Sequence, residues 1–222
     1  MLSSRANNLH PQVVQLGKLV KTVSTWNPLS VAGESQFTYV DLSAVDQSQK
    51  SIVGERTLLA KNAPSRARYV LECGDILVST VRPNLNAVAQ VPEHLHGSIG
   101  STGFCVLRAN ITTLDSRFLF HWVRSPVFVN RLVNLATGAS YPAVSDRIVR
   151  ESLISLPELA EQKRIAGILD QADALRAKRR AALAELDTLT QSIFLEMFGR
   201  VLDSESKWTM VQVQDAGRVQ LG

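Results

Sequence analysis

One loop of the chain displays side chains that suit the recognition of nucleic-acid bases. Residues 79–86 place one arginine and two asparagines directly after an apolar stretch that is typical of a strand. In the major groove, arginine pairs with O6 and N7 of guanine, and asparagine pairs with N6 and N7 of adenine. We therefore predict that this loop contacts DNA through Ser79, Thr80, Arg82, Asn84 and Asn86.

A second polar loop covers residues 137–147. It is rich in hydroxyl groups, which suit phosphate contacts and adjustable base contacts. The predicted DNA contacts of this loop are Thr137, Ser140, Tyr141, Ser145 and Arg147. Basic residues outside the two loops are predicted to contact backbone phosphates; they are Lys18, Lys21, Lys61, Arg66 and Arg68. For any one of these residues, a solvated surface position is the alternative.

The sequence contains no convincing catalytic motif. It has no G-x-x-x-x-G-K-[ST] loop to cradle ATP phosphates and no Asn-Pro-Pro-aromatic motif for amino methylation. Glu161 and Lys163 have an acid-x-lysine spacing, but they lie in a helical pattern that points them in different directions. His94 and His96 beside Glu93 lack a further ligand in view, and such pairs are more often part of a polar loop. We predict no catalytic and no metal-ligating residue.

Composition sets the outer limits of the architecture. The 222 residues are 45% hydrophobic and 20% charged, which fits one domain of ordinary size plus an appendage. No apolar run reaches the roughly 18 residues of a membrane span, and the first residues lack the apolar stretch of a signal peptide. We expect a cytoplasmic protein without membrane contact. Cys73 and Cys105 stand singly in apolar surroundings and are expected in buried strands.

The basic charge is concentrated in the first part of the chain. Net charge is +4 with an isoelectric point of about 9.3. Residues 1–157 hold 15 Lys and Arg against 10 Asp and Glu, whereas residues 158–222 hold 9 against 10. A surplus of this size is compatible with binding a polyanion but is also common in ordinary domains.

The first 157 residues combine strands with short helices. Five segments have the composition of strands and predict a mixed sheet: residues 37–40, 74–81, 87–91, 103–107 and 152–156. Asp115 is expected to cap one helix, and Pro126 to begin another that Gly138 ends. A short helix or strand is expected at residues 13–23, and the glycine cluster at residues 97–103 predicts a turn. The fold class is therefore α/β in the broad sense, more closely α+β.

A long helix is predicted over residues 158–198. Its apolar positions alternate in steps of three and four, which indicates the a/d seam of a coiled coil. The seam residues are Ile165, Ile168, Ala172, Leu175, Arg179, Ala182, Leu186, Leu189 and Ile193. Forty residues make a rod of about 60 Å, much longer than a small domain needs to cover its own sheet. A partner helix is expected, and a helix docked on its own domain is the alternative.

The tail at residues 199–222 resembles the entry to the first domain. Residues 208–216 are similar to residues 13–19, and in a competing alignment Val-Gln-Leu-Gly occurs at both 14–17 and 219–222. Either alignment predicts the start of a second, truncated repeat.

Taken together, these segments resemble a known family, the specificity (S) subunits of type I restriction-modification systems. The resemblance rests on Gly-Asp-Ile-Leu-Val-Ser at residues 74–79, on residues 101–108, on the loop at 137–145, and above all on Leu-Pro-Glu-Leu-Ala-Glu-Gln-Lys-Arg-Ile-Ala at residues 156–166. It implies a DNA target-recognition domain at residues 1–157, followed by a helical spacer at 158–198 that forms an antiparallel coiled coil and binds partners.

The resemblance also implies a division of labour. This chain would read one half of a bipartite site in double-stranded DNA and catalyse nothing. DNA adenine methyltransferase (modification) subunits and a restriction subunit would be its partners, and they would hold S-adenosylmethionine, ATP and Mg.

Full-length members of the family carry two recognition domains and two spacers, so the chain has the form of a half-subunit. One hypothesis is a homodimer paired through the spacer helix; the alternative is a truncation. A coiled-coil interaction or regulatory module that does not read DNA by itself is the alternative from another functional class.

Overall fold

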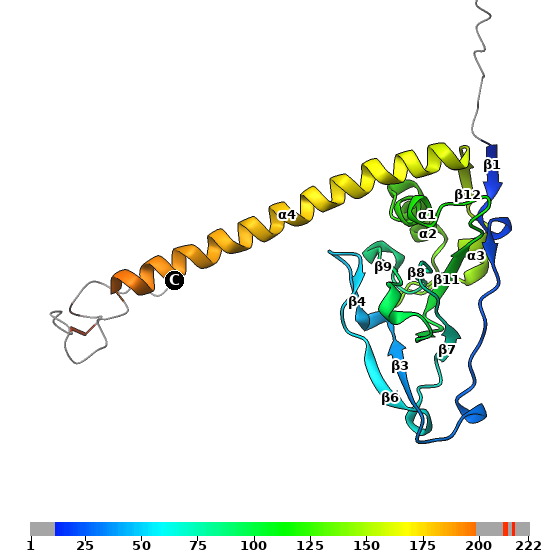
Figure 1. The fold of residues 1–222 in the computed structure, drawn as a ribbon, viewed down its shortest axis with the longest axis horizontal. Helices are drawn as coiled ribbons and strands as arrows, with labels where there is room; N and C mark the ends of the chain where they lie inside the picture. Colours follow the sequence, from blue (N-terminus) through cyan, green and yellow to red (C-terminus); the bar gives the residue numbers. More distant parts are fainter. Residues whose placement is uncertain (1–11, 199–210, 213–214, 216–222) are drawn as a thin grey trace, which may run out of the picture. The chain divides into compact units, whose positions relative to one another are not determined.

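The computed structural model describes residues 12–198, 211–212 and 215 (Figure 1). The chain divides into two compact units, Met1–Leu169 and Asp170–Gly222, with the boundary inside one long helix, α4 (Leu159–Phe198). The predicted repeat start at residues 199–222 lies almost wholly outside the described residues. None of the described helices combines the length and the apolar character that a membrane crossing requires.

Two four-stranded sheets form the framework of unit 1. One sheet has the strand order β6-β3-β10-β7, and the other has the order β2-β11-β8-β9. The first contains β6 (Arg56–Leu59), β3 (Gln36–Val40), β10 (Ile99–Ser101) and β7 (Ala67–Val70). The second contains β2 (Val20–Lys21), β11 (Phe104–Ala109), β8 (Ile76–Ser79) and β9 (Val88–Gln90). Smaller pairs are β1 (Gln12–Gln15) with β12 (Leu153–Leu156), and β4 (Val45–Asp46) with β5 (Ser51–Ile52).

The second sheet is buried on both faces. Its central strands pair antiparallel, with Phe104 opposite Ser79 and Leu107 opposite Ile76. One face joins a core with α1 (Ser116–Val123) and α2 (Pro126–Leu135), and the other face joins a core that includes Val40 and Leu71. The apolar run Ile-Leu-Val of β8 suits this position, because a strand covered on both sides needs no polar alternation.

Capping signals place the starts of α1 and α2 as predicted. The Asp115 carboxylate accepts hydrogen bonds from the amides of Arg117 and Phe118, both at 3.0 Å, at the start of α1. Pro126 occupies the first turn of α2, where its missing N–H would have no helical partner anyway. The fold is α+β with mixed strands and a long C-terminal helix, which confirms the predicted class.

Four details of the prediction are wrong. Residues 99–101, expected in a turn, form the buried strand β10, because they complete a sheet with segments far away in sequence. Helix α2 ends at Leu135, before Gly138. Residues 146–150 form a short helix, α3 (Asp146–Arg150), that had not been expected. Cys73 is exposed and lies outside any strand, whereas Cys105 is buried in β11 as expected.

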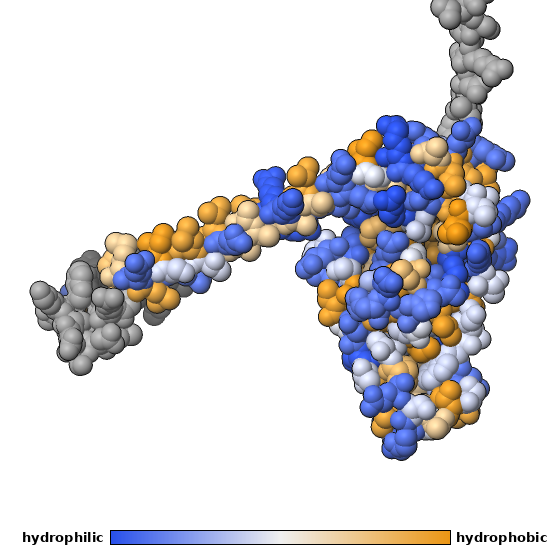
Figure 2. Space-filling model, viewed as in Figure 1, coloured by the Kyte–Doolittle hydropathy of each residue, from blue (hydrophilic) through white to orange (hydrophobic). Residues whose placement is uncertain are grey.

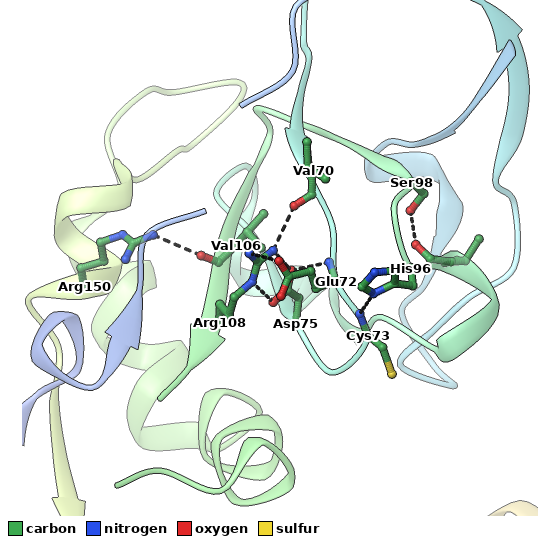
Figure 3. A network of polar contacts seen from close by, with 10 residues as sticks. Val70, Glu72, Cys73, Asp75, His96, Ser98, Val106, Arg108 and Arg150 are labelled. Carbon is green, nitrogen blue, oxygen red and sulfur yellow. Dashed lines mark hydrogen bonds and ion pairs between the residues drawn. The ribbon is translucent and has the colours of Figure 1, made fainter. Parts of the chain in front are cut away.

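A buried ion pair joins the turn before β8 to the far end of β11. The Arg108 guanidinium donates to both carboxylate oxygens of Asp75, at 2.9 and 2.8 Å, and also to Glu72 and to the carbonyl of Val70 (Figure 3). Two segments of the family resemblance, residues 74–79 and 101–108, therefore meet through their charged members.

Helix α4 begins on the surface of unit 1 and is fastened there by Gln162. This side chain is 1% exposed and makes three hydrogen bonds. Its amide oxygen accepts from the amide of Asp115 at 2.9 Å, and its nitrogen donates to the carbonyls of Thr113 and Pro157 at 3.0 and 2.9 Å. One residue thus connects the first turn of α4 to the cap of α1.

Candidate nucleic-acid interface

The two polar loops singled out from the sequence lie side by side. The amide of Arg82 donates to the carbonyl of Pro142 at 2.7 Å, and the amide of Val144 donates to the carbonyl of Thr80 at 2.9 Å. Val81 and Ala143 form an isolated antiparallel bridge between these bonds. Residues 79–86 and 137–147, here called the paired loops, therefore form one continuous surface.

Arg82 is the most conspicuous side chain of the paired loops. Its backbone is left-handed, with φ 50° and ψ 62°, a conformation that costs a residue with a side chain on the order of 1 kcal/mol. Its guanidinium carbon lies 4.5 Å from the ring centre of Tyr141, which is 67% exposed. No acceptor among the described residues takes a hydrogen bond from this guanidinium, so its donors face solvent from a supported position.

The short turn that carries Asn84 is held at its end by Asn86. Asn86 is also left-handed, at φ 48°, and its side-chain nitrogen donates to the carbonyl of Arg124 at 3.3 Å. Its own carbonyl accepts from the Lys50 ammonium at 2.5 Å. Asn86, predicted as a base contact, is thus half-buried and positions the turn, whereas Asn84 is exposed.

Lys50 and Arg124 add positive charge beside the paired loops. The pKa of Lys50 is lowered from its ordinary value, chiefly by burial and then by the charge of Arg124. The Arg124 guanidinium lies 4.7 Å from the ring centre of Phe120. The sequence prediction missed both cations, because they join the loop only through contacts between residues 36 and 38 positions apart.

Two predicted contacts need correction. Ser79, the last residue of β8, and Thr80, which follows it, are buried, at 5% and 8% exposure. The Ser79 hydroxyl donates to the carbonyl of Val81, and the Thr80 hydroxyl donates to the carbonyl of Gly103. These hydroxyls hold the base of the loop and are not displayed toward a ligand.

The second loop is closed by its own backbone. Thr137 and Ala143 exchange two hydrogen bonds, at 3.0 and 2.9 Å. Gly138 has φ 103°, and a side chain there would meet the carbonyl of Tyr141 at 3.0 Å, so the turn requires glycine. Thr137, Ser140 and Tyr141 are exposed around it.

Ser145 and Arg147 lie where this loop enters α3. The Ser145 hydroxyl caps the helix by accepting from the amide of Ile148 at 3.4 Å. Arg147 is exposed and paired with Glu151 at 2.6 Å. Hydrogen bonding to Glu151 raises the pKa of Arg147.

The predicted phosphate contacts are not all near the paired loops. The backbone of Arg66 is near the base of the first loop. Its carbonyl accepts a hydrogen bond from the amide of Thr102, and the carbonyl of the next residue, Gly103, accepts from the hydroxyl of Thr80. Lys21 pairs with Arg108 at the other end of β11, four residues or about 13 Å along the strand from Phe104. The remaining three have other neighbours: Lys18 lies three residues before Lys21, Lys61 forms an ion pair with Glu34, and Arg68 donates to the carbonyl of Ala67.

Side chains that could bind a metal ion or act as an acid or base do not cluster elsewhere in the described part of the chain. In the described part of the chain, His, Cys, Asp and Glu side chains form no group of three that would hold a metal ion. His96 accepts a hydrogen bond from the amide of Cys73 at 3.3 Å (Figure 3). Glu161 is bonded twice by Arg164, which lowers the pKa of the carboxyl.

Most of the predicted partner seam is exposed. Ile165 is half-buried against the core of unit 1. From Asp170 on, nearly the whole described helix is exposed, and apolar side chains are visible along it (Figure 2). The large seam residues Ile168, Leu175, Leu186, Leu189 and Ile193 are between 47% and 67% exposed. Further exposed apolar residues lie off the seam: Leu183, Phe194, Leu195 and Met197.

Comparison with known proteins points to one family. The family described as "Type I restriction modification DNA specificity domain" matches residues 46–186. The EcoDI specificity subunit of Escherichia coli is 27% identical over 149 residues, which are 65% of this chain and 32% of that protein. The HsdS subunit of Thermoanaerobacter tengcongensis is 38% identical with a TM-score of 0.68, over 83% of this chain and 48% of that one.

A further solved chain, from a study of complex assembly and conformational transition of the type I R-M system, is 36% identical with a TM-score of 0.70. The match covers 89% of this chain and 51% of that one. The chain thus spans about a third of the curated relative and about half of each solved structure.

Proposed function

The chain belongs to the type I restriction-modification DNA specificity family, and from this membership we propose that unit 1 reads DNA sequence through the paired loops. The substrate would be double-stranded DNA, and the recognised element one half of a bipartite site.

The observation that carries this proposal is the geometry of Arg82. Its guanidinium is exposed, lies against Tyr141, and has no acceptor among the described residues. A supported fork of donors matches O6 and N7 of guanine in the major groove. Asn84 is exposed in the same turn and has the side chain that pairs with adenine. Base contacts of this kind specify sequence, whereas phosphate contacts set position.

Positive charge beside the paired loops supports the same reading. Lys50, Arg66 and Arg124 lie around the loop bases and suit contacts to backbone phosphates. They do not discriminate bases. Their loss would weaken binding to all sequences about equally, and would reduce its dependence on salt.

Chemistry would belong to partner subunits. In this proposal the chain is non-catalytic and directs adenine methylation by modification subunits and cleavage by a restriction subunit. S-adenosylmethionine, ATP and Mg would be bound by those partners. The exposed off-seam residues of α4, such as Phe194 and Leu195, suit contacts with a modification subunit, because exposed apolar clusters commonly mark protein interfaces.

Two copies of the chain would pair through the exposed seam of α4 to read a whole site. Identical domains related by a two-fold axis read identical half-sites. The recognised sequence would therefore be an inverted repeat with a constant gap.

Methylation mapping tests the proposal directly. The chain is co-expressed with a modification subunit of the same source in a host without adenine methylation, and methylated adenines are mapped across the genome. Methylation at a split inverted repeat is expected, and the Arg82→Ala variant should lose it. Soluble, associated subunits that methylate nothing would contradict the proposal. If the isolated chain also lacks salt-sensitive DNA binding, a purely protein-binding module becomes the better account.

A further inference from the structure

We propose that two α4 helices pair antiparallel in one fixed register, with Arg179 facing Ala182 of the second copy. This inference rests on the proposed pairing of two copies. It adds which residues face each other, and three properties of the exposed seam select the register.

The first property is the extent of the seam that is free to pair. Ile165 packs against the core of unit 1, so the available seam begins at Ile168. Its last apolar member is Ile193, which is 47% exposed. With Arg179 facing Ala182, the successive layers are Leu175 with Leu186, Ala172 with Leu189, and Ile168 with Ile193. Every exposed seam residue is then used, whereas a shift by one heptad leaves some of them without an apolar partner.

The second property is the charged residue in the seam. Arg179 occupies an a position, where a guanidinium must keep contact with water or lose much of its hydration energy. Ala182 is small and leaves room for the long side chain to bend toward the surface. Shifting the register by one heptad places Arg179 against Leu175 or against Leu189, and a leucine would cover the charge.

The third property is the charge on the flank of the seam. Lys178 precedes one a position and Glu185 precedes the next, and flanking residues of this type face each other in antiparallel coiled coils. In the proposed register Lys178 lies near Glu185 of the second copy, and the pair occurs twice. The two shifted registers instead bring Lys178 near Lys178, or Glu185 near Glu185, of the second copy. Charge complementarity therefore selects the same register as packing.

Charge reversal tests the register on the full chain. The dissociation constant of the homodimer is measured by sedimentation equilibrium for the wild type, Lys178→Glu, Glu185→Lys and the double variant. Each single reversal turns two attractions into two repulsions, and it should weaken the dimer about tenfold. The double variant restores opposite charges and should return to within about threefold of wild type. Arg180→Glu is the matched control, because Arg180 follows an a position, away from the seam, and this reversal should leave the constant nearly unchanged.

The outcomes separate the register from the proposed function. A double variant no tighter than the single variants would overturn the register while leaving the dimer intact. A wild-type chain that remains monomeric at every concentration would overturn the pairing itself, while DNA reading by unit 1 would be decided separately by the methylation map. All substituted side chains are exposed in the single chain, and circular dichroism checks that each variant keeps its helix.

Discussion

Asp75 and Arg108 form a two-pronged ion pair although they lie 33 residues apart in the sequence. The Asp75 side chain is 1% exposed and that of Arg108 is 12% exposed. Hydrogen bonding to Asp75 is the main cause that raises the pKa of Arg108. The ion pair fastens the turn before β8 to strand β11. These two strands are the central strands of their sheet, and their opposite ends support the paired loops.

Replacing Asp75 should destabilise unit 1 strongly. In Asp75→Ala the Arg108 guanidinium keeps Glu72 but loses its buried partner, and breaking such a pair costs about 3–5 kcal/mol. Urea denaturation measures the free energy of unfolding. Glu72→Ala is the control: its carboxylate is 48% exposed, so its loss should cost less than about 1 kcal/mol. Similar small losses in both variants would contradict a structural role for the buried pair.

Arg82 should determine sequence preference more than overall affinity. Arg82→Lys keeps the charge but loses the planar fork, so binding to the recognised site should fall by about 10- to 100-fold with little change for unrelated DNA. Fluorescence anisotropy with both DNAs at fixed salt measures this. Arg56→Lys is the matched control and should leave both affinities nearly unchanged. Arg56 lies on β6 and its guanidinium is paired with Asp41. Equal losses for both DNAs would assign Arg82 to phosphate binding instead.

Tyr141 should act through Arg82. Tyr141→Phe keeps the aromatic face below the guanidinium and should retain specific binding within about threefold. Tyr141→Ala removes that face and should weaken specific binding by about fivefold or more. If Tyr141→Ala leaves specific DNA binding unchanged while Arg82 is present, the ring contact does not position the guanidinium.

Gln162 should matter far more than its neighbour Lys163. Gln162→Leu leaves the amide of Asp115 and two carbonyls without partners in a buried place, which should cost at least about 2 kcal/mol. Lys163→Leu, at an exposed position of the same turn, should change stability by less than about 0.5 kcal/mol. Thermal or urea unfolding of both variants measures the difference. A small loss for Gln162→Leu would mean that water replaces the side chain.

The two cysteines should differ in reactivity, and the buried Cys105 should make the stability of the fold depend on pH at high pH. Burial raises the pKa of the Cys105 thiol from 9.0 to about 12, so the folded chain keeps a proton that the unfolded chain releases. The free energy of unfolding should therefore fall as pH rises from about 9 toward 12, by at most about 1.4 kcal/mol per pH unit from this group. Cys105→Val should reduce that slope. At pH 8 a thiol reagent should modify Cys73 quickly and Cys105 only on unfolding.

Local signals in the sequence predicted much of the fold. Asp115 and Pro126 mark helix starts because caps act within one turn. The spacing of apolar residues predicted α4, because helical periodicity is also a local property of the sequence. Strand β10 was missed because Ile99 and Gly100 are strand residues only through partners on β3 and β7. Pairing between distant segments leaves little trace in local composition.

The candidate site shows the same division. Composition identified both polar loops, and Arg82, Asn84 and Tyr141 are exposed in the structure. Composition did not distinguish Ser79 and Thr80, whose hydroxyls are turned inward, from the displayed residues. It also did not indicate that the loops meet, since the bonds between them are formed by backbone groups.

The backbone hydrogen bonds between the paired loops bear on how DNA recognition could change during evolution. The paired loops are joined by the main chains of Arg82, Pro142, Thr80 and Val144, and main-chain bonds do not depend on the identity of the displayed side chains. In the proposed role of the paired loops, substitutions at Asn84, Ser140 or Tyr141 would therefore alter what is read, while the main-chain bonds beneath persist. Under the same proposal, a surface built this way would let new specificities arise by single substitutions, because other residues determine the folding of the domain.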